Sequence, residues 1–148
     1  GDSVVFHYNR HTELLEHSFT RLADFSNPPR LVSCKDPLEE ERCCSGVFHI
    51  DDAPIVFAAR DALSHYVLMM YELSKSEEFE SELMELRMKQ TSNSQLLQIA
   101  GKENFNFTDD VLYPLLRSAD SEADFKELME LLHTKRLIDI DDYTLAIL

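Results

Sequence analysis

Two adjacent cysteines and a nearby histidine make ERCCSGVFHIDD, residues 41–52, the stretch of this chain whose residue types most suggest chemistry. Thiolates and imidazoles are the ligands of structural zinc sites, usually at a Cys-x-x-Cys spacing. Cys43 and Cys44 lack that gap, and Cys34 and His49 could join them only if the whole loop wrapped around one ion. Free cysteines usually pack as small hydrophobic residues, and the neighbouring glutamates disfavour a reactive thiolate. We therefore expect neither a metal nor a redox site here.

Two further groups of residues resemble metal-binding patterns only in part. His7 and His11 are four residues apart and would share one face of a helix, but the pattern lacks the glutamate of H-E-x-x-H. The aspartates of 139–142 resemble the opening of a calcium loop, which needs a glycine at its sixth position. That position is Thr144. We expect a helix cap there and no metal.

No motif for catalysis or for binding a cofactor is present. The chain has three glycines and contains no G-x-S-x-G, P-loop or G-x-G-x-x-G pattern. With 28 acidic residues, any pair of carboxylates is uninformative, and the acidic run at 77–85 is most simply a solvated surface. The sequence therefore predicts a non-enzymatic domain without a cofactor.

The charge argues against two classes of partner. Lys and Arg number 14 against 28 Asp and Glu, a formal net charge of −14. Such a chain repels nucleic-acid phosphates and anionic membrane surfaces. The most apolar stretch, 53–73, is interrupted by Arg60, Asp61 and His65, so no transmembrane helix is expected. Three cysteines do not form a disulfide framework, which favours a reducing compartment, the cytoplasm or the nucleus.

The elements that would position these residues are predicted to be helices. Apolar residues recur every three or four positions from Val4 to Phe25, which predicts a helix that Pro28 and Pro29 end. A second, mostly apolar helix is expected from Asp51 or Asp52 to Leu73, at the centre of the fold. Further helices are expected at 36–44, 76–89, 94–101, 108–119, 121–136 and from 139 or 141 to the end.

These elements predict an all-α fold, a compact bundle of about six or seven helices in one domain spanning 1–148. One long, partly extended connection at 28–52 interrupts it, and whether 47–50 pairs with another strand stays open. The chain begins at Gly1 without a methionine and ends in an apolar run, so we expect it to be part of a longer protein.

The function expected is a protein–protein interaction or assembly domain, a scaffold or adaptor, with homodimerisation as one form. The N-terminal apolar seam could pair with a second copy or pack inside its own chain. The methionines at 69, 70, 84 and 88 either adapt to an irregular partner or belong to the core. The candidate contact residues are Val4, Tyr8, Leu15, Phe19, Met84 and Met88. Two alternatives are a helical-repeat segment that binds RNA or peptide and a helical domain that binds a small molecule.

Overall fold

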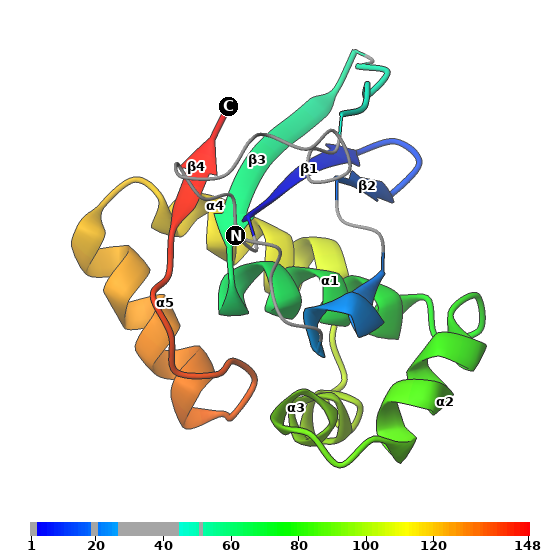
Figure 1. Ribbon diagram of the computed structural model, residues 1–148. Coiled ribbons are helices and arrows are strands. Elements are labelled where there is room, and N and C mark those ends of the chain that lie inside the picture. Colours follow the sequence, from blue (N-terminus) through cyan, green and yellow to red (C-terminus); the bar gives the residue numbers. More distant parts are fainter. Residues whose placement is uncertain (1–2, 19–20, 27–44, 51) are drawn as a thin grey trace, which may run out of the picture.

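The computed structural model of the chain describes residues 3–18, 21–26, 45–50 and 52–148. Within this part, helices pack on one four-stranded antiparallel sheet, so the predicted all-α bundle is wrong and the fold is mixed α/β (Figure 1). The strands are β1 (Ser3–Asn9), β2 (Leu14–His17), β3 (Pro54–Arg60) and β4 (Leu145–Ile147), in the order β2-β1-β3-β4. The helices are α1 (Ala62–Ser74), α2 (Glu80–Met88), α3 (Ser92–Ala100), α4 (Tyr113–Ser118) and α5 (Glu122–Thr134), with a 3-10 turn η1 (Leu22–Ser26) and a π-helical turn η3 (Phe107–Leu112).

The predicted N-terminal helix is instead the hairpin β1–β2 followed by η1. In β1, side chains alternate between the two faces, and Val4, Phe6 and Tyr8 are fully buried. The side chain of Asn9 accepts hydrogen bonds from the backbone N–H groups of two loop residues, at 2.8 and 2.9 Å, and so forms the turn into β2. A spacing of four residues satisfies both a helix and a strand, which explains why the sequence pattern predicted the wrong element.

The predicted central helix divides into two elements. Residues 54–60 form β3, and the helix proper, α1, begins only at Ala62. Asp61 separates them with a φ of 48°, in the left-handed region where the chain direction changes sharply. Ten consecutive residues of α1 are buried, so its predicted central place is confirmed.

Most of the later helices are confirmed, and the last is not. Helices form in the regions predicted at 76–89, 94–101, 108–119 and 121–136, although α3 begins two residues earlier, at Ser92, and η3 one residue earlier, at Phe107. Ser121 caps α5, since its hydroxyl accepts the N–H of Asp124 at 3.1 Å. The predicted C-terminal helix is instead β4, which pairs with β3. The predicted helix at 36–44 lies outside the described residues.

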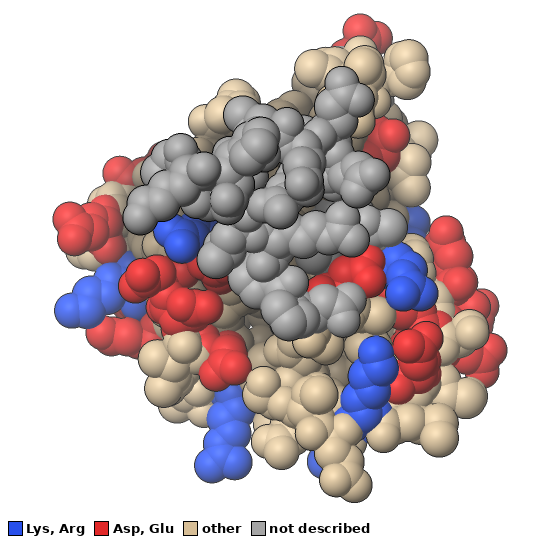
Figure 2. Space-filling view, in the orientation of Figure 1, with Lys and Arg blue, Asp and Glu red and all other residues tan. Residues whose placement is uncertain are grey.

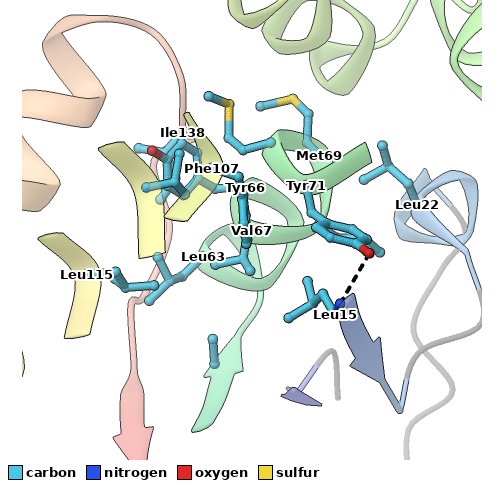
Figure 3. Close-up of a cluster of buried hydrophobic side chains, with 14 of the residues drawn as sticks. Leu15, Leu22, Leu63, Tyr66, Val67, Met69, Tyr71, Phe107, Leu115 and Ile138 are labelled. Carbon is cyan, nitrogen blue, oxygen red and sulfur yellow. Dashed lines mark hydrogen bonds between the residues drawn. The ribbon is translucent and has the colours of Figure 1, made fainter. Parts of the chain in front are cut away.

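The core lies between one face of the sheet and α1, with the other helices around α1 (Figure 1). Figure 3 shows the side chains of α1 meeting residues from the sheet, from η1 and from η3. The ring of Tyr71 in α1 lies 5.3 Å from that of Phe107. Its hydroxyl oxygen accepts the backbone N–H of Leu15 at 3.1 Å, which ties α1 to β2.

The opposite face of the sheet is covered near its centre. His7 on this face is 2% exposed, and its Nδ1 lies 2.8 Å from a carboxylate oxygen of Glu16 on β2. The ring of Phe48 lies 5.9 Å from that of His7. The described residues 45–50 form no strand, so residues 47–50, whose pairing the sequence left open, do not join the sheet, and Val47 and Ile50 are exposed.

We predict that Tyr71→Phe lowers the free energy of unfolding by about 1–3 kcal/mol, because the buried N–H of Leu15 loses its acceptor. Chemical denaturation followed by circular dichroism measures this change. Tyr143→Phe is the matched control, since its hydroxyl donates to the carbonyl of Asp139 at 2.6 Å on an exposed segment. Equal losses in the two variants would contradict the importance assigned to the Tyr71 bond.

Candidate functional site

The free side of β4 is the clearest unsatisfied feature of the described structure. β4 lies at one end of the sheet order and pairs only with β3, with Leu145 opposite Ala59 and Ile147 opposite Phe57. The pairing extends beyond the strand at both ends, since Arg60 N–H donates to the Thr144 carbonyl at 3.2 Å and Leu148 N–H to the Val56 carbonyl at 2.9 Å. In Figure 1, β4 is the outermost strand beside β3.

The ladder fixes which backbone groups point away from the sheet. In an antiparallel pair, alternate residues direct both their N–H and their C=O to the same neighbour. Thr144 and Leu148 face β3, so Ala146 does too, and the backbone groups of Leu145 and Ile147 point to the open side. No hydrogen bond from the described residues reaches these groups. β4 therefore presents two donors and two acceptors to an added strand.

The helix layer ends before it fully covers β4. Directly opposite residues of an antiparallel pair share a face, so Ile147 lies on the same face as Phe57. Phe57 is fully buried, yet Leu145 is only partly buried and Ile147 is 50% exposed. An apolar strip is thus left open at this edge.

A groove of about 270 Å³ lies beside this strip, between the α4–α5 turn and the segment that leads into β4. Phe125, Tyr143 and Leu145 supply its apolar lining, and each is only partly buried. The polar lining is given by Ser118, Ser121, Glu122 and Thr144. The groove is wide enough for one apolar side chain of a strand laid along β4.

Acidic side chains surround this edge. In residues 117–148 the exposed acids are Asp120, Glu122, Asp124, Glu127, Glu130, Asp139, Asp141 and Asp142, against four bases, Arg117, Lys126, Lys135 and Arg136. Figure 2 shows acidic side chains gathered on the flank that Figure 1 assigns to α5 and the chain leading to β4. The potential at this edge is therefore negative.

A second polar feature lies inside the molecule, where η1 meets α1 and α2. Glu72 of α1 is 2% exposed, and burial, with the nearby Glu82, raises its pKa to about 8. The backbone N–H of Leu22 hydrogen-bonds to Glu72, and that of Ala23 donates to Glu82 at 3.1 Å. His65 is also buried, and burial lowers its pKa to about 4. This arrangement holds η1 in place, and Glu72 and His65 are closed to solvent.

The residues predicted to contact a partner fall into separate places. Val4, Tyr8 and Leu15 lie in the core, where their side chains offer no surface to a partner. Met84 and Met88 lie on α2 and are 55% and 81% exposed, and their contact with a partner stays a prediction. Phe19 lies outside the described residues. The structure brings none of the exposed candidates to the edge at β4.

The candidate metal ligands are not brought together where the structure describes them. His7 lies on the sheet and His11 in the hairpin loop, so they share no helix face. The aspartates of 139–142 lie in an irregular segment before β4 and do not cap a helix. No group of three His, Cys, Asp or Glu that could hold a metal ion occurs among the described residues. Cys34, Cys43 and Cys44 lie outside them, so the expectation about the cysteines stays a prediction.

Sequence reasoning missed β4, and one local signal could have found it. Tyr143, Leu145 and Ile147 recur at a spacing of two, which is the period of a strand. None of the helices in the described part of the chain has both the length and the apolar character needed to cross a bilayer. Comparison with protein-family models, with curated proteins and with solved structures finds no match to this chain.

We predict that Glu72→Gln removes a loss of stability that wild-type protein shows between about pH 6.5 and 8. The folded pKa of Glu72 is raised, so its contribution to stability is complete below its unfolded pKa of 4.5 and is lost as pH rises through about 8. The folded pKa of His65 is lowered, so its contribution to stability is complete above pH 6.5 and is lost as pH falls through about 4. Of these two groups, only Glu72 lowers the stability as pH rises above 6.5.

Denaturation at several pH values tests this. Wild type is expected to lose about 1–2 kcal/mol between pH 6.5 and 8, and Glu72→Gln almost none. Gln keeps a carbonyl that accepts the Leu22 N–H. Glu78→Gln, an exposed change on the same side of the molecule, should retain the wild-type slope. A wild-type curve that is flat over this range would show that Glu72 is ionised in the folded protein.

Proposed function

We propose that this chain is a non-enzymatic protein–protein interaction module that binds its partner at the free edge of β4. The observation that supports this is the combination of outward backbone groups on Leu145 and Ile147 with the half-exposed side chain of Ile147. Proteins normally protect such an edge, because it is a template for pairing with another chain. An edge left apolar and open fits a surface that a partner covers.

Two features of the rest of the molecule agree with this role. The described groups with large pKa shifts, Glu72, Tyr66 and His65, are buried in the packing around α1, where a substrate could not reach them. The groove beside β4 is lined by apolar and small polar side chains and contains one charged residue, Glu122. A recognition surface needs shape and backbone groups more than reactive side chains.

The proposal is tested by affinity capture with three baits, which are the wild-type chain, Ile147→Pro and Ile147→Ala. Ile147→Pro removes one outward N–H and leaves the groups that face β3 in place, so partners should be lost. Ile147→Ala shortens the side chain and keeps the N–H, so it is the matched control and should retain them more weakly. Mass spectrometry of the captured proteins, with circular dichroism to confirm folding, gives the result. Identical partners for all three baits would contradict binding at β4.

A further inference from the structure

We propose that the partner of this edge is an extended, basic segment of another protein, which adds to β4 as a fifth strand. This inference depends on the proposed function and specifies the chemistry of the partner. Its first basis is geometric. Leu145 and Ile147 offer an N–H and a C=O each on the open side, spaced as a strand and not a helix would satisfy them.

The groove determines what the added strand must carry on one of its faces. A residue placed directly opposite Leu145 would share the face of Leu145 and point toward the helix layer. The groove that receives it is lined by Phe125, Tyr143 and Leu145. An apolar side chain, such as valine or isoleucine, fits this lining, and burying it would also cover the exposed part of Ile147.

The acidic side chains around the edge determine which side chains the added strand carries at its other positions. Glu122 lies on the rim of the groove, and the aspartates of 139–142 precede β4. None of these acids forms an ion pair with a described basic residue, whereas Glu130 farther along α5 lies 3.9 Å from Lys126. Lysine or arginine at the alternate positions of the strand, or next to it, would meet unpaired acids. A second copy of this chain is a poorer fit, because it carries the same excess of acids around its own β4 and the same net charge of −14.

The test uses a defined probe, a peptide of about seven residues that alternates lysine with valine, and its counterpart with glutamate for lysine. Two-dimensional NMR of the labelled chain follows binding residue by residue. The lysine peptide should bind with a dissociation constant below about 1 mM and shift the amides of Leu145 and Ile147 most. The glutamate peptide should not bind. Binding should weaken several-fold when salt is raised from about 0.05 to 0.5 M.

Two kinds of variant make the result specific to the site. Ile147→Pro should weaken binding of the lysine peptide at least tenfold, and Ile147→Ala should weaken it less. The triple variant Glu122→Gln, Asp141→Asn, Asp142→Asn leaves the strand untouched and should weaken binding about tenfold. Asn at 141 retains an oxygen for the N–H of Asp142, which now donates to Asp141 at 2.8 Å.

Several outcomes would overturn the inference. One is equal binding of the two peptides to the wild-type chain. Another is equal binding of the lysine peptide to wild type and Ile147→Pro. A third is a set of amide shifts confined to α2. Analytical ultracentrifugation provides another: a dimer that forms with concentration and is lost in Ile147→Pro would assign the edge to a second copy. If capture depends on Ile147 but the lysine peptide fails to bind, the interaction module stands and the basic strand does not.

Discussion

The burial of α1 on every side is the constraint on which the rest of the structure depends. From Leu63 to Glu72 every residue is buried, so the helix must be covered all round its circumference. The sheet covers one side, and η1, α3 and η3 contact the others. The arrangement is stabilised by apolar contact, and it forces two ionisable groups, Glu72 and His65, out of water. Their packing against η1 is the polar consequence of enclosing this helix.

The same constraint explains which elements could be predicted from the sequence. The apolar run of α1 is long enough and continuous enough to be recognised as a central helix, and α5 has both a clear cap and a helical period. The strands could not be separated from helices by spacing alone. Val4, Tyr8 and the residues after them recur every three or four positions, which a hairpin folded on a helix can also produce. β3 runs into α1 with only Asp61 between them, so the apolar pattern predicted a single element.

The site was missed for a different reason. An open edge is a property of the whole sheet, because which strand is outermost depends on pairings between residues as far apart as Ala59 and Leu145. β4 has three residues, too few for a periodic signal to outweigh the helical pattern around it. The groove beside it joins the α4–α5 turn to residues 143–145 and exists only once these segments meet. The acids of 139–142 were visible in the sequence, but their place beside an edge strand was not.

A comparison of the two ends of the sheet supports the proposal that a partner covers the edge at β4. β2, at the other end, carries Glu16, and a charged side chain on an edge strand opposes pairing with another chain. Residues 145–148 carry no charge and no proline, so the usual protection is missing from the strand itself. The acids lie instead just before it, at 139–142, where they repel an acidic chain such as a second copy and leave the backbone groups accessible. Flanking charges of this kind repel some chains and leave the edge open to others. This is expected of a strand that pairs with one class of partner and does not pair with a second copy of its own chain.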